Sequence, residues 1–437
     1  MNSKLTPFQL ILFVVIVFLI IAGVLTFALK KQASQDKLPQ ITVWGTLDRD
    51  FFVAYQDAMN TVNPESIAIT YSEFSEDDFE DELINALASG VGPDAIVFTE
   101  DLIVEHENKL FTIGYDFYKQ SDFKNNFIEG AEVLLKEDGI LGIPFLVDPL
   151  VLYWNRTTLN SAGISQPPQY WDEFLELVPQ LTVSDSSSNI TRSAVSLGEF
   201  RNINNAKEIF TTIVGQAGNP IVVREIEDGS IGNFTSVFSE RFGYKVSPAD
   251  AAINFFTQFS NPSKKTYTWN RSLPQSDEMF LSGDLAFYLG YASERNSLIE
   301  RNPNLNFGIA QLPQSRSSVQ KYTGGKMHFL GILNGSENIT SAYTQFITMS
   351  SSQNMSFLYD LINLPPVRRD LLAEVPSVDY RDTFNKAALI TKPFVDPDPE
   401  ATQALFHNSI ESVISGRFSV GDILKKVDND LELIIKN

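Results

Sequence analysis

The segment 142–177 limits what this chain can fold into more than any other part of the sequence. Ile143 to Trp154 is apolar, β-branched and aromatic, as is typical of a buried strand, yet it contains Asp148 followed directly by Pro149. An unpaired charge in a core costs several kcal/mol, so a carboxylate there implies a use. Proline lacks a ladder donor, so the strand should bend or break at this point. We therefore expect a strand that leaves one domain, bends at Asp148 and enters a second, which would place this carboxylate in a cleft.

The rest of this segment indicates a second packing unit. After a Pro-Pro turn, apolar residues at 171, 174, 175 and 178 have the i, i+3, i+4, i+7 spacing of an amphipathic helix. A chain of 437 residues exceeds the size of a usual single core, so two domains are the default expectation. The composition, 43% hydrophobic and 20% charged, is that of an ordinary globular protein.

Strands and helices alternate in the first part of the chain after the N-terminal apolar run. Strand-like segments at 41–46, 67–71 and 95–98 are separated by helical segments at 51–59 and 76–88. This β-α-β-α-β order predicts a parallel sheet with helices on its faces, and such sheets bind ligands outside the carboxyl ends of their strands. The candidate ligand contacts at these ends are Trp44, Gly45, Thr46, Asp48, Glu73, Phe98, Glu100 and Asp101. For the tryptophan, core packing at the strand end is an equal alternative.

Later regions add further candidates. A buried strand is expected to end at Gly290 and Tyr291, which places the tyrosine ring at a strand end. Trp269 lies in the polar loop YTWNRS, so we expect its ring to be exposed for a ligand. Gly324 and Gly325 precede a strand, where they either allow close backbone approach to a ligand or form only a crossover hinge.

Together these segments resemble the family 1 extracellular solute-binding proteins, the receptors of ABC importers that capture sugars and related small solutes. Within 142–177 the resemblance rests on Gly-Ile-Pro, an apolar strand with an acidic residue before LVLYWN, Ala-Gly-Ile, Pro-Pro and an aromatic-Asp-Glu-Phe helix start. It continues through VWGT at 43–46, SGVGPDAIVF at 89–98, FLSGDLAFYLGY at 280–291 and INLPPVRR at 362–369. The combination of these motifs, in this order, is far more specific than a single short motif.

The resemblance implies an α/β, two-lobed periplasmic-binding-protein fold, type II-like, with an interlobe cleft. Residues 38–147 with about 322–366 would form the first lobe, and 148–321 with about 367–437 the second.

The resemblance also implies roles for single residues. In sugar-binding members, acidic residues after the first and third strands bind ligand hydroxyls, and Asp48 and Asp101 stand at the matching places. Glu199 would be an acidic residue near the ligand, and the Tyr291 ring would stack on a sugar.

The N-terminus carries a run from Phe8 to Leu29 without a charged residue. A helix of this length, at about 1.5 Å per residue, spans roughly the hydrocarbon core of a bilayer, whereas a signal-peptide apolar region has about 7–15 residues. We therefore expect residues 1–37 to form an uncleaved membrane anchor, with a transmembrane helix at about 8–29 and a linker, rather than a cleaved signal. Lysines on both flanks leave the orientation open. The resemblance implies an extracytoplasmic soluble domain on a bacterial cell membrane.

The remainder of the chain is strongly acidic. The first 37 residues hold four lysines and one aspartate, which leaves 29 basic and 53 acidic side chains in 38–437, a net charge of −24. Such a charge argues against nucleic acid and anionic membrane surfaces as partners. Solubility is the simplest reason for it, and a cationic ligand is the sharper alternative.

These observations predict a binding protein rather than an enzyme. No G-x-S-x-G, H-E-x-x-H or P-loop pattern occurs, and the three histidines lack metal-ligand spacing, so we expect no cofactor and no metal site. The absence of Cys excludes disulfides and thiolate ligands. Carboxylates alone cannot separate a binding cleft from a glycosidase, because glycoside hydrolysis uses two of them.

The functional hypothesis is a monomeric, membrane-anchored receptor that delivers a small solute to the permease subunits of an ABC importer by hinge closure. A sugar or oligosaccharide is the first ligand class, because carboxylates suit its hydroxyls and aromatic planes suit its C–H face. A cationic or peptide-like solute is the main rival. A surface glycan-active enzyme, or a sensor without a transporter, is the alternative from another class.

Overall fold

The computed structural model describes residues 40–436 apart from 65, 228–229, 317 and 319. The predicted membrane anchor, with its helix at about 8–29, lies outside these described residues. Within them, no helix combines the length and the apolar character needed to cross a bilayer.

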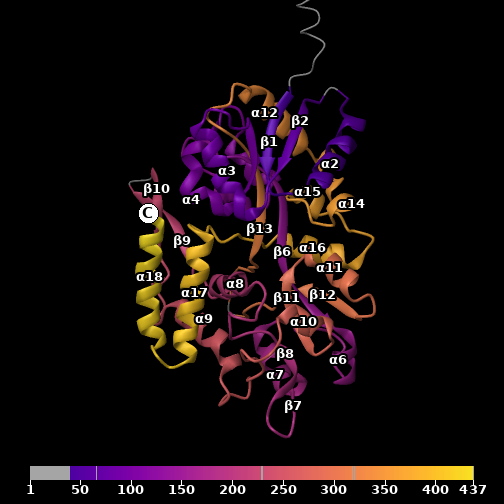
Figure 1. Cartoon of the computed structure of the whole chain (residues 1–437), viewed down its shortest axis with the longest axis vertical. Coiled ribbons are helices and arrows are strands. Elements are labelled where there is room, and N and C mark those ends of the chain that lie inside the picture. The colour runs from indigo at the N-terminus through magenta and orange to yellow at the C-terminus, as the bar shows by residue number, and fades with distance from the viewer. Residues whose placement is uncertain (1–39, 65, 228–229, 317, 319, 437) are drawn as a thin grey trace, which may run out of the picture.

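Two hydrophobic cores divide the described chain into two lobes, the first at the top of Figure 1 and the second below it. The first core draws on 41–147, 327–358, Val367, Leu372 and Ala388. The second core draws on 150–312, Leu364 and 384–431. The first core therefore continues past residue 366, where the expected boundary between the lobes lies.

The first lobe opens with the predicted β-α-β-α-β order. Its elements before the crossing are β1 (Gln40–Gly45), α2 (Arg49–Val62), β2 (Ala68–Glu73), α3 (Glu76–Ala88), β3 (Ala95–Thr99), η1 (Glu100–Leu102), α4 (Ile103–His106), η2 (Glu107–Lys109), β4 (Ile113–Gly114), α5 (Gln120–Asn126), η3 (Glu129–Leu134) and β5 (Gly139–Ile140). β1 pairs in parallel with both β2 and β3, so the carboxyl ends of these strands meet at one edge of the sheet.

Helix α3 has the predicted bounds, and its sequence explains them. The Ser75 hydroxyl accepts a hydrogen bond from the Asp78 N–H and so caps the amino end, where acidic residues also suit the helix dipole. Phe79, Leu83 and Ala86 form the buried face. The acidic amino end of α3 consequently points toward the edge of the sheet where ligands of such folds bind.

Strand β6 (Ile143–Asn155) joins the two lobes and is buried along its whole length. Its first part pairs with β13 as far as Pro149, and its second part pairs with β11 and β12 from Leu150 onward. A break at the proline, one of the two predicted outcomes, is wrong, because β6 is one continuous strand. The Leu150 N–H donates to the Gly324 carbonyl at 2.9 Å and the Pro149 carbonyl accepts from the Ala292 N–H at 3.0 Å, so the pairing continues although proline has no N–H.

The second lobe packs its helices around β6, β11, β8 and β7. Its elements up to the return crossing are α6 (Arg156–Ser161), α7 (Trp171–Leu181), β7 (Val183–Ser184), β8 (Ile190–Val195), α8 (Ala206–Gln216), β9 (Val222–Glu227), β10 (Ser230–Ser236), α9 (Pro248–Thr257), η4 (Gln258–Ser260), α10 (Ser276–Leu281), β11 (Leu285–Tyr291), α11 (Glu294–Arg301) and β12 (Phe307–Gln311). After the return crossing, β13 (Gly325–Ile332), α12 (Ile339–Met349), α13 (Ser352–Met355), α14 (Leu358–Ile362) and α15 (Arg369–Leu372) contribute to the first core. The last elements, α16 (Asp379–Ala388), α17 (Pro399–Ile414) and α18 (Val420–Lys436), contribute to the second core.

A hairpin from the second lobe also contacts the first lobe outside the crossing strands. Strands β9 and β10 rise beside α18 toward α4 in Figure 1. Arg224 of β9 forms an ion pair with Glu107, and Phe234 of β10 packs against the first core. The hairpin is held to the second lobe by α18, where Glu432 accepts a hydrogen bond from the Thr235 hydroxyl at 2.6 Å.

Candidate functional site

A cavity of about 340 Å³ lies between the two lobes, within the size range of small-molecule sites. The first lobe lines it with the start of α3, the end of β3 and η1. The second lobe lines it with α8, the end of β11 and the segment before α17. Its lining residues are Thr46, Glu76, Asp77, Phe79, Glu80, Val97, Phe98, Thr99, Glu100, Asp101, Leu102, Lys207, Glu208, Thr211, Tyr291, Tyr322, Gly324, Gly325, Lys326, Phe394, Asp396 and Pro399.

The wall of the first lobe is acidic. Glu100 is 5% exposed, and its Oε2 accepts a hydrogen bond from the Met327 N–H at 2.9 Å. Burial raises the pKa of Glu100 well above its usual range, and the neighbouring charge of Asp101 adds to the rise. Burial also raises the pKa of Asp101 to about 6, with a contribution from Asp396. These two carboxyl groups therefore face the cavity without enough positive charge to offset their desolvation.

The wall of the second lobe carries a buried ion pair. The Lys207 ammonium donates to Asp396 Oδ2 at 2.6 Å and to the Pro399 carbonyl at 3.1 Å. Asp396 is 1% exposed, and it also accepts from the Thr402 hydroxyl at 2.7 Å. This network fixes the segment before α17 against α8 and so shapes one side of the cavity.

Tyr291 completes the second wall, and a buried polar network holds it. Its N–H donates to Glu294 Oε1 at 2.8 Å, and its carbonyl accepts from the Tyr153 hydroxyl at 2.7 Å. Burial raises the pKa of the Tyr291 hydroxyl, and the carboxylates of Glu208 and Glu100 raise it further. The end of β11 is thus a rigid support that presents an aromatic ring to the cavity between acidic side chains.

Asp148 lies behind this wall rather than on it. It is 8% exposed, it is not among the cavity-lining residues, and its Oδ1 accepts a hydrogen bond from the Ser293 N–H at 3.0 Å. Burial raises its pKa to about 7. The expectation that this carboxylate faces the cleft is therefore wrong, because its backbone partner holds it in the turn that supports Tyr291.

The structure brings together only part of the predicted site. Of the candidates, those that line the cavity are Thr46, Phe98, Glu100, Asp101, Tyr291, Gly324 and Gly325. Those that do not line it are Trp44, Gly45, Asp48, Glu73, Asp148, Glu199, Trp269 and Gly290.

Structural roles account for the candidates near β1 and β2 that miss the cavity. The Asp48 carboxylate caps α2 by accepting from the Phe51 N–H at 2.8 Å, and Glu73 accepts from the Arg49 N–H at 2.9 Å. The Trp44 ring packs on Phe74 with ring centroids 4.6 Å apart. Both carboxylates therefore bind backbone N–H groups at the amino end of α2 instead of lining the cavity.

Two candidates of the second lobe are in its interior. Trp269 has no exposed surface, and its indole N–H donates to Asn202 Oδ1 at 3.0 Å, so the expected exposed ring is wrong. Glu199 is 3% exposed and lies 3.4 Å from the Arg271 guanidinium, away from the cavity. The polar residues next to Trp269 in the sequence do not indicate exposure, because the hydrogen-bond partner that allows its burial, Asn202, comes from a distant loop.

The glycines before β13 allow close packing of the protein itself. A Cβ on Gly324 would lie 2.2 Å from Thr212 Oγ1, and one on Gly325 would lie 2.8 Å from the Asp148 carbonyl. Both glycines also border the cavity. The close approach that they permit is between the crossing segment, α8 and β6.

Sequence reasoning missed the charged and aromatic residues that reach the cavity from the second lobe and from the crossing segment. They are Lys207, Glu208, Tyr322, Lys326, Phe394 and Asp396. Lys207 and Asp396 are 189 residues apart in sequence, and no local pattern connects them.

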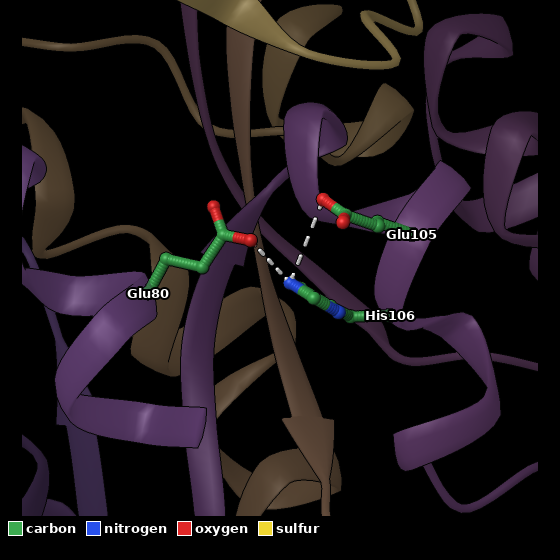
Figure 2. A group of neighbouring side chains, drawn as sticks. All are labelled: Glu80, Glu105 and His106. Carbon is green, nitrogen blue, oxygen red and sulfur yellow. Dashed lines mark hydrogen bonds and ion pairs between the residues drawn. The ribbon is translucent and has the colours of Figure 1, made fainter. Parts of the chain in front are cut away.

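One group at the rim of the cavity has the composition of a metal site. Glu80 of α3 and Glu105 and His106 of α4 point toward one another in Figure 2, with ligand atoms within 4.8 Å. The His106 Nε2 lies 2.5 Å from Glu80, while its Nδ1 accepts from the Lys109 ammonium at 2.7 Å. A metal on Nε2 would require the proton on Nδ1, which faces that ammonium, so the arrangement fits a hydrogen-bond chain better than a metal.

The sequence pattern that defines the bacterial extracellular solute-binding proteins matches residues 53–386 of this chain. A binding protein of Brucella abortus (strain 2308) is 22% identical over 156 residues, which cover 35% of this chain and 38% of the relative. The matched stretch therefore spans well under half of that relative.

Solved structures show the same fold over nearly the whole chain. The cyclic alpha-maltosyl-1,6-maltose binding protein of Arthrobacter globiformis has a TM-score of 0.73 at 16% identity, with 92% of this chain and 100% of that chain covered. The sugar-binding protein of Xanthomonas citri has a TM-score of 0.70 at 18% identity, with 91% and 97% covered. At these identities the likeness establishes the two-lobed α/β fold.

Proposed function

This chain belongs to the family of bacterial extracellular solute-binding proteins, and we propose that it is a receptor that delivers a sugar or oligosaccharide to an ABC importer. The family is one of binding proteins rather than enzymes, which removes the glycan-active enzyme from the alternatives. The single observation that carries the sugar assignment is the cavity between the lobes, where carboxylates of η1 face the ring of Tyr291. Carboxylates accept hydrogen bonds from hydroxyls, and an aromatic plane packs on the C–H face of a pyranose.

The surroundings of the cavity support a ligand of more than one sugar unit. A second hollow of about 890 Å³ shares Thr211, Tyr322 and Phe394 with the first, so the two adjoin. Both structural relatives described above bind saccharides, to judge from their names.

Hinge closure is the proposed mechanism. Three segments connect the lobes: β6, the stretch before β13 and the stretch between α15 and α16. Solute contacts from both walls would stabilise the closed form, which the permease then recognises. We further propose that residues 1–37 anchor the protein in the membrane and that the remainder, a monomer, lies outside the cytoplasm.

Isothermal titration of the detergent-solubilised full chain tests this function. Maltotriose, mannotriose, cellobiose, spermidine and a neutral tripeptide are titrated in turn, and at least one saccharide should bind with a Kd in the micromolar range or tighter. Binding of the tripeptide alone would overturn the sugar assignment in favour of a peptide-like solute.

A Tyr291→Ala variant, which removes the proposed stacking ring, should weaken saccharide binding at least tenfold. A Tyr343→Ala variant, altered on α12 away from the cavity, is the matched control and should bind as the unmodified chain does. Unchanged binding by Tyr291→Ala would show that the saccharide lies elsewhere.

A further inference from the structure

The lining of the cavity between the lobes carries a large surplus of acidic groups. Its seven carboxylic acids are Glu76, Asp77, Glu80, Glu100, Asp101, Glu208 and Asp396. Only two basic side chains, Lys207 and Lys326, share the lining with them. A neutral saccharide would leave this imbalance uncorrected.

Both lysines of the lining are already engaged. Lys207 lies 2.6 Å from Asp396, and Lys326 lies 3.2 Å from Glu76. The charge of Lys326 also reaches Glu100 and Asp101, yet the pKa of both carboxyl groups stays raised, so two ammonium groups do not offset the acidic lining. The acidic groups that remain are Asp77 and Glu80 of α3, Glu100 and Asp101 of η1, and Glu208 of α8, so they lie on both sides of the cavity.

Two of the remaining carboxylates have unused hydrogen-bonding capacity that faces the cavity. Glu100 is 95% buried, and its Oε2 accepts from the Met327 N–H, while its Oε1 has no bond from another residue in the described chain. The Glu208 carboxylate takes part in no hydrogen bond or ion pair among the residues that the structure describes, and it lies near enough to Tyr291 to perturb its hydroxyl. A ligand group between η1 and α8 would meet an acceptor on each side.

The energetics of closure favour a cation at this place. When the lobes close, water leaves the cavity, and a carboxylate that loses water without a positive partner costs several kcal/mol. A sugar hydroxyl supplies one hydrogen bond but no charge, whereas a protonated amine supplies both. An ammonium near the Tyr291 face would also gain a cation–π interaction.

We propose that the solute is an aminated saccharide, whose ring lies against Tyr291 and whose protonated amine lies between Glu100 and Glu208. The proposal rests on the saccharide-receptor function given above and adds the charge of the ligand to it. It also gives the acidic lining a role beyond solubility.

Titration of the full chain with matched sugars tests the proposal. The probes are the disaccharide of β-1,4-linked glucosamine, N,N′-diacetylchitobiose and cellobiose, which share a backbone and differ at the C2 substituent. Glucosamine and glucose extend the comparison to single rings, so the result does not depend on whether the protein accepts a β-1,4 linkage. The aminated member of each set should bind at least tenfold more tightly than the neutral ones, and salt should weaken its binding selectively.

Two variants locate the amine. Glu208→Gln and Glu100→Gln keep the side-chain shape, each remove a carboxyl group that can pair with the amine, and should lower the preference for the aminated sugar about tenfold or more. Glu374→Gln removes one charge from an exposed residue outside the cavity and should leave the preference unchanged. The ratio of the two affinities is informative here, because a merely structural change would weaken both sugars alike.

The outcomes separate this proposal from the receptor function. If cellobiose or glucose binds as tightly as its aminated counterpart or more tightly, the proposal of a cationic ligand is overturned, while the proposal of a saccharide receptor is not. An unchanged ratio in both Gln variants overturns the placement of the amine. Binding of spermidine without any saccharide would overturn the saccharide receptor and the aminated saccharide together.

Discussion

The two walls of the interlobe cavity satisfy their charges in different ways. In the second lobe, Lys207 and Asp396 form an ion pair whose side chains are 10% and 2% exposed, and hydroxyl and carbonyl groups complete it. In the first lobe, Lys326 meets a Glu76 side chain that is 68% exposed, while Glu100 beside it is buried.

The two walls therefore have different roles in ligand binding. Apart from the Glu208 carboxylate, the second wall is internally satisfied, and the network around Glu294 fixes the position of Tyr291, so this wall can orient a ring. The first wall has carboxyl groups that gain a partner only when something binds. We therefore expect removal of the buried ion pair of the second wall to change stability more than removal of the ion pair of the first wall.

The strongest test of this comparison removes each lysine in turn. Lys207→Met leaves Asp396 buried without its positive partner, which should lower the free energy of unfolding by about 3–5 kcal/mol. Lys326→Met breaks a pair whose side chains are 30% and 68% exposed, which should cost about 1 kcal/mol or less. Urea unfolding monitored by tryptophan fluorescence measures both.

A double variant provides the control for this test. Adding Asp396→Asn to Lys207→Met removes the unpaired charge and should recover part of the lost stability. Equal losses in the two single variants would contradict the proposed difference between the walls.

A smaller effect is expected where the chain passes from the second wall to the first. The Gly324 N–H donates to Thr212 Oγ1 at 3.1 Å, so Gly324→Ala places a methyl group where no space exists and should cost about 1–3 kcal/mol. The shift of α8 should also displace Glu208. Gly335→Ala is the control, because a Cβ there meets no atom within 4 Å. Unfolding curves that coincide for both variants would show that α8 adjusts freely.

The first wall was more predictable from sequence than the second, for a physical reason. Its residues follow strands and open helices, so hydrophobic periodicity locates α3, and the edge of a parallel sheet brings Glu100 and Asp101 to the cavity. In the first wall, the residues that local sequence pattern places at strand ends are also the residues that reach the cavity.

The second wall depends on contacts that local pattern does not encode. Lys207 and Asp396 meet across most of the lobe, and Trp269 is buried because Asn202 accepts from its indole. Asp148 was correctly recognised as unusual, but its partner, the Ser293 N–H, lies 145 residues away. The sequence indicates that a buried carboxylate needs a partner without indicating whether that partner is a ligand or the protein.

The last test concerns the support of the second wall. The pKa of Asp148 is about 7 in the folded protein, above its usual value of 3.8, because burial disfavours the charged form. The folded state therefore keeps a proton that the unfolded chain releases near pH 4, so this residue lowers stability as the pH rises from about 4 to about 7. Asp148→Asn does not titrate and can still accept from Ser293. Its thermal midpoint, measured at intervals across this range, should rise relative to the unmodified chain as the pH increases, while that of Glu374→Gln should follow the unmodified chain. Parallel curves for Asp148→Asn and the unmodified chain would show that water reaches this carboxyl group and that the second wall is less tightly closed than its contacts indicate.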